Sequence, residues 1–258
     1  MLKNTFSLLS GVITFSLVWN LISSPNTVSA EPLKWSKLYN GVEFIEKDYG
    51  KWFKKGKLYA IKIDKKRKLR ILVDDRANSS LKDMMSRYKP IAIVNGSYFD
   101  EKYKPVGLLK INNELIKSLN EYGSSGILAI NENEVSIFNK KEYSKYKNYP
   151  NLLQNGPLLV ENNGKLGIYS DDHEYKARTA LGITKDNKVL IVVADITASP
   201  SLFEIAEVLA KPESQGGFDC KTAINLDGGS STGLRINLPN KRVVVEENDF
   251  INNAIGIF

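Results

Sequence analysis

Asn225-Leu226-Asp227-Gly228-Gly229-Ser230-Ser231-Thr232 follows the short apolar run Thr222-Ala223-Ile224. The apolar run predicts a buried strand, and the polar stretch after it marks where that strand stops contributing to a core. Glycines allow φ > 0 and close approach of a ligand, and Asp227 could act as a base, a nucleophile or a metal ligand. Asn225 adds an amide two residues earlier on the same face. A tight Asp-Gly turn between two strands is the structural alternative.

Similar apolar runs dominate the rest of the chain and predict strands. They cover residues 58–63, 69–73, 91–94, 127–130, 135–138, 180–184, 189–194, 223–226, 234–236, 243–245 and 254–257. The runs 91–94 and 190–194 are apolar throughout, which predicts central strands covered on both faces. Pro239-Asn240 is typical of the turn of a hairpin between the strands 234–236 and 243–245.

Helical signals are fewer than strand signals. Ser201 opens a capping-box pattern with Glu204, and Ser80 could cap a second helix over 81–88. Strands do not alternate regularly with helices, which argues against a doubly wound sheet. We therefore expect an α+β fold, a single domain with a mixed, largely antiparallel β-sheet core and a few helices.

The first thirty residues have the pattern of a signal peptide. Lys3 precedes an apolar stretch over 6–22, and Val28-Ser29-Ala30 offers small residues for cleavage before Glu31. An uncleaved membrane anchor is the alternative. We expect a secreted or cell-envelope-associated protein with a 1–30 signal peptide, a 31–56 segment packing on the domain, a 57–258 domain, and no membrane span in the mature chain.

Charge and cysteine content exclude some classes of function. The formal net charge of +7 is diffuse, and no basic cluster interleaved with aromatics predicts nucleic-acid binding. The nearest candidate, residues 139–149, is better explained as a solvated helix or loop. Cys220 is the only cysteine, so no internal disulfide is possible. Because it precedes a buried strand and the chain has one histidine, core packing is favoured over a nucleophilic role.

Other predicted strands also have unusual polar residues beside them. The flanking residues are Asn95-Gly96 after 91–94, Asn155-Gly156 before 158–160, Arg178-Thr179 before 180–183 and Asp195 after 189–194. A fold that gathers these strand ends would make one pocket lined by amides, two carboxylates and an arginine.

These fragments together resemble the phosphodiester glycosidase domain family over roughly residues 58–258. The family patterns N-G-x-Y-F, P-x-G-L, N-G-P, R-[TS]-A-x-G, an apolar strand ending in aspartate, and N-L-D-G-G occur here in that order. They match Asn95 to Phe99, Pro105 to Leu108, Asn155 to Pro157, Arg178 to Gly182, Asp195, and Asn225 to Gly229. Ser230 stands where the family usually has a third glycine. Asn112-Asn113 replaces a turn glycine, and asparagine tolerates the left-handed conformation.

The resemblance implies a glycosidase-type hydrolase that releases the sugar of a sugar-1-phosphodiester and leaves a phosphomonoester. Such a reaction needs an anion site and a carboxylate near the anomeric carbon, and the acidic leaving group reduces the need for a general acid. Asp227 is the first choice for base or nucleophile, Asp195 is the second carboxylate, and Arg178 would grip the phosphate in a bidentate fork. The substrate-binding residues expected on this basis are Asn95, Gly96, Asn155, Gly156, Thr179, Asn225, Gly228, Gly229 and Ser230.

Each of these roles has an alternative. Arg178 could be a buried structural arginine paired with Asp195, and Asp195 could simply form a turn. His173, in the polar stretch 171–174, is better explained as a solvated loop residue than as a catalytic one. That stretch could attract a divalent cation, but its spacing fits no known loop, and we expect no required cofactor.

The expected partner is an envelope or extracellular glycan, or another sugar-1-phosphodiester substrate, rather than nucleic acid. Two functional alternatives stay open. One is a non-catalytic envelope protein that binds anionic glycan, and the other is a phosphodiesterase that cleaves the P–O bond.

Overall fold

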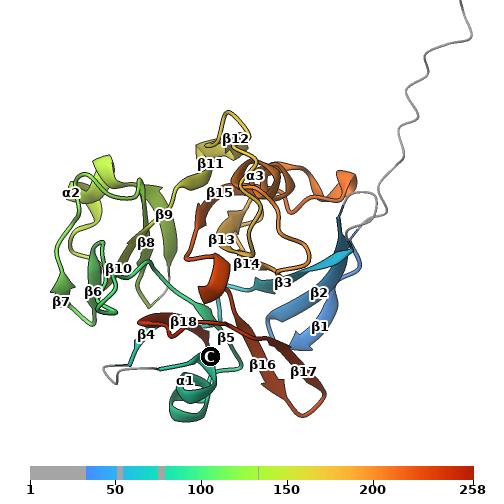
Figure 1. The fold of residues 1–258 in the computed structure, drawn as a ribbon, viewed down its shortest axis with the longest axis horizontal. Coiled ribbons are helices and arrows are strands. Elements are labelled where there is room, and N and C mark those ends of the chain that lie inside the picture. The colour runs from blue at the N-terminus through green and yellow to red at the C-terminus, as the bar shows by residue number, and fades with distance from the viewer. Residues whose placement is uncertain (1–32, 51–54, 75–78, 133) are drawn as a thin grey trace, which may run out of the picture.

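Three antiparallel β-sheets form the body of the protein (Figure 1). The computed structural model describes residues 33–50, 55–74, 79–132 and 134–258. In these ranges the strand pairs are antiparallel and the helices are short, so the expected α+β class with a largely antiparallel core is confirmed. The expected signal peptide over residues 1–30 lies outside the described residues.

The largest sheet has eight strands, with the apolar strands β13 and β14 near its centre. In spatial order they are β1 (Ser36–Tyr39), β2 (Val42–Tyr49), β3 (Gly56–Ile63), β14 (Val189–Ala194), β13 (Arg178–Thr184), β15 (Cys220–Asn225), β11 (Leu158–Glu161) and β12 (Lys165–Leu166). Every residue of β13 and β14 is buried, because α3 (Leu202–Ala210) packs on one face and the other sheets on the other. Helix α3 begins at the predicted capping box of Ser201 and Glu204.

The part of the 31–56 segment that the structure describes packs at the edge of this sheet, where it forms the hairpin β1–β2. Gly41 in its turn has φ 72°, a conformation that glycine adopts without strain.

The second sheet has five strands. Their order is β7 (Glu114–Lys117), β6 (Leu109–Ile111), β10 (Asn151–Asn155), β8 (Gly126–Ile130) and β9 (Val135–Asn139). Asn112 and Asn113, between β6 and β7, have φ of 49° and 71°, the left-handed conformation expected there. After β9 the chain forms η1 (Lys140–Glu142) and α2 (Tyr143–Tyr146), which confirms a largely solvated helical stretch.

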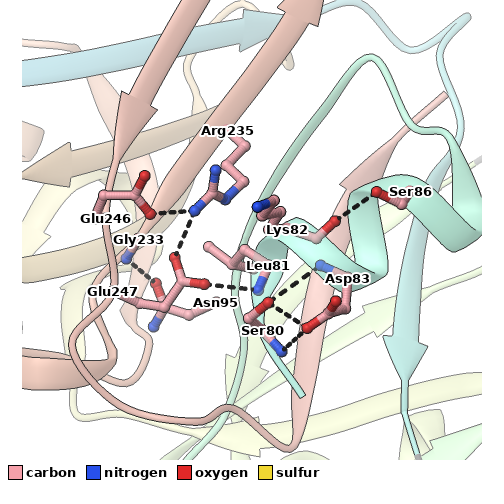
Figure 2. A network of polar contacts seen from close by, with 10 residues as sticks. All are labelled: Ser80, Leu81, Lys82, Asp83, Ser86, Asn95, Gly233, Arg235, Glu246 and Glu247. Carbon is pink, nitrogen blue, oxygen red and sulfur yellow. Dashed lines mark hydrogen bonds and ion pairs between the residues drawn. The ribbon is translucent and has the colours of Figure 1, made fainter. Parts of the chain in front are cut away.

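The third sheet also has five strands and carries the first polar strand end. Their order is β17 (Lys241–Val245), β16 (Leu234–Leu238), β5 (Ala92–Asn95), β18 (Asn253–Ile257) and β4 (Leu69–Val73). The predicted hairpin turn at Pro239-Asn240 is confirmed. Helix α1 (Leu81–Tyr88) packs on this sheet and begins at Ser80, whose side chain accepts a hydrogen bond from the Asp83 N–H (Figure 2).

The three sheets share one apolar core. Leu128, Ile191 and Ile255 come from different sheets and are buried in the same cluster. Cys220 is fully buried beneath α3, and burial raises the pKa of its thiol, so the packing interpretation is confirmed. Because the sheets meet over this core, the polar ends of β5, β10, β13 and β15 come within hydrogen-bonding distance of one another. Within the described ranges, no helix is both long and apolar enough to cross a membrane.

Candidate active site

The polar loop after β15 is held between the largest sheet and the third sheet. The N–H of Asp227 donates to Gly96 O at 2.9 Å, which ties the loop to the end of β5. The N–H of Gly229 donates to Ala177 O at 2.8 Å, which ties the same loop to the start of β13. The chain then forms the short turn η4 (Gly229–Ser231) and enters β16. The tertiary structure therefore brings together three of the strand ends that the sequence predicts to meet, those of β5, β13 and β15.

The Asn95 side chain holds this loop in place through hydrogen bonds. Its Nδ2 donates to Asp227 O at 2.7 Å, and its Oδ1 accepts from Thr179 Oγ1 at 2.7 Å and from Gly233 N at 3.2 Å. Figure 2 shows the last of these bonds, at the start of β16. Both Asn95 and Thr179 have no exposed surface. Asn95 and Thr179 therefore support the loop, and the geometry gives no evidence that either side chain contacts a ligand directly.

The Tyr98 hydroxyl lies between the amide of Asn225 and the carbonyl of Gly156. Asn225 Nδ2 donates to the Tyr98 hydroxyl oxygen at 2.8 Å, and that hydroxyl donates to Gly156 O at 2.8 Å. The side-chain oxygens of Asn155 and Asn225 are buried and accept no hydrogen bond among the described residues. Buried acceptors without a donor are costly and call for a bound water or ligand. These two oxygens are therefore the amide acceptors of the site that still have capacity for a donor.

The glycines of the site serve close packing more than anion binding. A Cβ on Gly96 would lie 1.9 Å from Asn253 Oδ1, and Gly156 has φ 150°. The N–H of Gly228 donates to Asp227 Oδ1 at 2.8 Å, and that of Gly229 is used by Ala177 O. Both N–H groups already have acceptors, so neither is left free to bind a phosphate. Open space adjoins Gly229, since a Cβ there would meet no atom within 4 Å.

Asp227 is the carboxylate that the fold perturbs most clearly. Burial raises its pKa to about 6, and the negative charge of Asp249 adds to the rise. Hydrogen bonds from the Ser231 side chain and the Gly228 N–H act in the opposite direction. Burial and the charge of Asp227 raise the pKa of Tyr98 to about 12, so that phenol keeps its proton at neutral pH. A carboxylate with a pKa near 6 can exchange a proton at neutral pH, as a general base must.

Arg178 is a buried cation beside this loop. Only 7% of its surface is exposed, its Nη2 donates to Glu174 O at 2.6 Å, and its Nε donates to Pro200 O at 3.2 Å. Burial lowers its pKa, because removal from water disfavours the charged form of a cation. Its acceptors are carbonyl oxygens, and no carboxylate of the described residues forms an ion pair with it. The alternative that pairs Arg178 with Asp195 is therefore wrong.

Asp195 lies at the end of β14, on the far side of β13 from the Asp227 loop. Its Oδ1 accepts from the N–H groups of Thr197 at 3.0 Å and Ala198 at 2.7 Å, so the carboxylate shapes a strand-end turn. Two strand spacings separate it from Asp227, roughly 10 Å. The structure does not bring the two carboxylates together, and a catalytic role for Asp195 stays a prediction.

The polar stretch 171–174 lies near Arg178, as expected. The side chain of His173 is 72% exposed, consistent with the solvated-loop interpretation. In the part of the chain that the structure describes, no three or more histidine, cysteine, aspartate or glutamate side chains cluster closely enough to hold a metal ion. A cavity of about 960 Å³ lies elsewhere, between β4, β9 and the turn after β6.

Sequence reasoning missed two side chains of the site, Tyr98 and Asp249. Tyr98 belongs to the N-G-x-Y-F match, so its motif was a usable signal. Asp249 stands in the charged stretch Glu246-Glu247-Asn248-Asp249, where nothing marks one acid over another. The packing of that stretch against Ser230 brings Asp249 to the site. The N–H of Asn248 donates to Ser230 O at 2.7 Å, and Ser230 Oγ donates to Asp249 Oδ2 at 3.5 Å.

Comparisons with known proteins agree with this geometry. The sequence model of the phosphodiester glycosidase family matches residues 88–258. The fold is similar to the crystal structure of a hypothetical protein from Synechocystis, with a TM-score of 0.70 and 14% identity, covering 89% of this chain and 64% of that one. It is also similar to the catalytic domain of zebrafish N-acetylglucosamine-1-phosphodiester alpha-N-acetylglucosaminidase auto-inhibited by its pro-peptide. That match has a TM-score of 0.64 and 17% identity, and covers 84% of this chain and 82% of that one. No protein with a curated description matches the chain.

Proposed function

Because the chain belongs to the phosphodiester glycosidase family, we propose that it is a hydrolase that cleaves the C1–O bond of a sugar-1-phosphodiester. In this reaction the oxygen of water forms a bond to C1 of the sugar, and the bond between C1 and the bridging oxygen breaks. The phosphate leaves as a phosphomonoester that keeps the bridging oxygen, and the proton of the water passes to a base.

The observation that carries the proposal is the buried guanidinium of Arg178 beside the Asp227 loop. A buried cation that lacks a carboxylate partner is costly, and an anionic ligand would offset that cost. The Arg178 side chain lies close to the Asp227 loop, because a Cβ added to Gly228 would be 3.8 Å from Arg178 Cδ. A phosphodiester carries the single negative charge and the oxygen acceptors that this guanidinium lacks.

We assign Asp227 as the residue that acts at the reacting carbon, C1 of the sugar. Above pH 6 its carboxylate is largely ionised and can accept the proton of the attacking water or attack C1 itself. Because a phosphate monoester is an acidic leaving group, the bridging oxygen needs little help from a general acid. The site accordingly needs one well-placed carboxylate and one cation, and Asp227 and Arg178 supply them.

The test is hydrolysis of a panel of sugar-1-(methyl phosphate) diesters in water labelled with ¹⁸O. The zebrafish enzyme is named for N-acetylglucosamine, so the diester of that sugar heads the panel, with those of glucose, galactose and mannose. We expect label in the released sugar. Label in methyl phosphate alone would establish P–O cleavage, and the absence of turnover across the panel would contradict the proposal.

Two variants separate an enzyme from a binding protein. Asp227→Asn should remove most turnover while the protein keeps its fold and still binds methyl phosphate, and Arg178→Met should weaken methyl phosphate binding. Arg67→Met is the matched control, because Arg67 stacks on Tyr39 at 4.8 Å, away from the site. Full turnover in Asp227→Asn would rule out the role we assign to this carboxylate.

We further propose that the protein is exported and acts on an envelope or extracellular glycan. The support is the signal-peptide pattern over residues 1–30, with cleavage before Glu31. Fractionation of expressing cells and N-terminal sequencing of the mature protein test this. An intact N-terminus on cytoplasmic protein would contradict it.

A further inference from the structure

An acidic and aromatic surface adjoins the Asp227 loop at Ser230. It is formed by Ser230, Asp249, Phe250 and Tyr103, and we call it the Asp249 face. The N–H of Asn248 donates to Ser230 O at 2.7 Å, which joins this surface to the loop. Phe250 is 41% exposed, a large fraction for an aromatic side chain beside a polar site.

Hydrogen bonds and ring contacts hold this surface in one arrangement. Asp249 Oδ1 accepts from Phe250 N at 2.8 Å and from the Tyr103 hydroxyl at 3.4 Å. The Tyr103 ring meets Phe250 edge-on at 5.9 Å and stacks on Phe99 at 5.3 Å. Asn252 Nδ2 donates to Tyr103 O at 2.6 Å and fixes the turn that carries the tyrosine. Phe250 is therefore an exposed ring whose position is set before any ligand binds.

Asp249 keeps one oxygen for a ligand. Among the described residues its Oδ2 accepts only from Ser230 Oγ, at 3.5 Å, which is the outer limit of a hydrogen bond. Ser230 directly follows Gly229, and open space adjoins that glycine, because a Cβ there would meet no atom within 4 Å. An ionised carboxyl group accepts hydrogen bonds and donates none, so its suitable partners are hydroxyl or amide donors.

Arg178 and the Asp249 face differ in charge and therefore suit different ligands. Asp249 repels a phosphate, while Arg178 attracts one. A sugar ring is neutral, offers several hydroxyl donors, and has an apolar face of C–H groups that can cover an aromatic ring. We propose that the Asp249 face is the sugar subsite, in which a pyranose stacks on Phe250, donates hydroxyl hydrogen bonds to Asp249 Oδ2, and turns its phosphate toward Arg178.

This inference rests on the proposed function, and its test uses the two products separately. The free sugars of the panel and methyl phosphate are titrated into wild-type and variant protein, with dissociation constants measured by NMR. Phe250→Ala should weaken sugar binding at least about tenfold and leave methyl phosphate binding unchanged. Asp249→Asn should also weaken sugar binding about tenfold, without weakening methyl phosphate. Arg178→Met should show the reverse pattern.

Three control variants accompany these. Phe250→Trp keeps a ring surface and should retain sugar binding. Tyr122→Ala removes a fully exposed aromatic elsewhere, and Glu246→Gln removes an exposed acid of the same stretch that pairs with Arg235; both should bind sugar as the wild type does. Circular dichroism confirms that each variant is folded.

The outcomes distinguish the subsite from the proposed function. The subsite is overturned if wild-type protein binds none of the sugars, or if Phe250→Ala and Asp249→Asn bind sugar normally. It is also overturned if both variants lose methyl phosphate to the same extent as sugar. Failure of the labelled-water experiment with retained, Phe250-dependent sugar binding would instead refute hydrolysis and leave the subsite standing.

Discussion

Asp227→Asn should make the protein more stable at neutral pH while it removes activity. The pKa of Asp227 is about 6 in the folded protein against an ordinary value of 3.8, so the folded state binds this proton more tightly than the unfolded chain. Stability from this group is therefore fully present below pH ~4 and is lost as the pH rises through 6. About two pKa units correspond to about 3 kcal/mol, which is the cost of ionised Asp227 at pH 7.5.

Asparagine removes the charge but keeps an oxygen that can accept from the Gly228 N–H. Part of the gain is offset, because the hydrogen bond from Ser231 is weakened. We therefore expect Asp227→Asn to raise the free energy of unfolding by about 1–3 kcal/mol at pH 7.5 and to have little effect near pH 4. Turnover should fall roughly 10²–10⁴-fold, the range for loss of a general base.

Urea unfolding followed by circular dichroism at both pH values measures the difference. Asp195→Asn is the matched control. The Asp195 carboxylate accepts hydrogen bonds from the N–H groups of Lys57, Thr197 and Ala198, so this variant should be less stable than the wild type. The reasoning is refuted if Asp227→Asn is less stable than the wild type at pH 7.5. It is equally refuted if the difference between the two proteins does not depend on pH.

Three further results are expected. The kcat/KM of the wild type should rise with pH through about 6 as Asp227 loses its proton. Asp249→Asn should move that rise to lower pH, because the charge of Asp249 raises the pKa of Asp227. A rise at the same pH in the variant would contradict this. Gly96→Ala should lower the free energy of unfolding by about 1–3 kcal/mol, because the added Cβ would lie 1.9 Å from Asn253 Oδ1. A melting curve like that of the wild type would contradict the packing described. Cys220 should resist alkylation by iodoacetamide until the protein is unfolded, because it is fully buried and burial raises the pKa of its thiol; labelling of native protein would show the opposite.

Strand positions were largely readable from the sequence where a run was apolar and buried. Strands β4 and β14 have the predicted bounds, and α1 and α3 begin at the predicted capping serines. The strands β6 and β7 were not predicted, because they are only three and four residues long, and every residue of β7 is exposed. The hairpin β1–β2 had a usable signal in Asn40-Gly41, a pair typical of two-residue hairpin turns.

The sequence by itself determined which chemical groups the protein has at its strand ends. Local apolar patterns place Asp227, Arg178 and the asparagines beside strands, because burial on a strand depends on residues close in the chain. Their roles depended on contacts between residues far apart in sequence. Only the register of the sheets decides that Asn95 supports the loop from inside and that Asp195 is separated from it by β13.

The same physical reason explains the residue that the sequence did not single out. Asp249 is one acid among several in its stretch, and its position beside Ser230 follows from the return of the chain through β16, β17 and β18. Local patterns therefore determined the inventory of the site. Tertiary packing decided which carboxylate is buried, which cation has carbonyl acceptors but no carboxylate partner among the described residues, and which exposed ring lies near the loop.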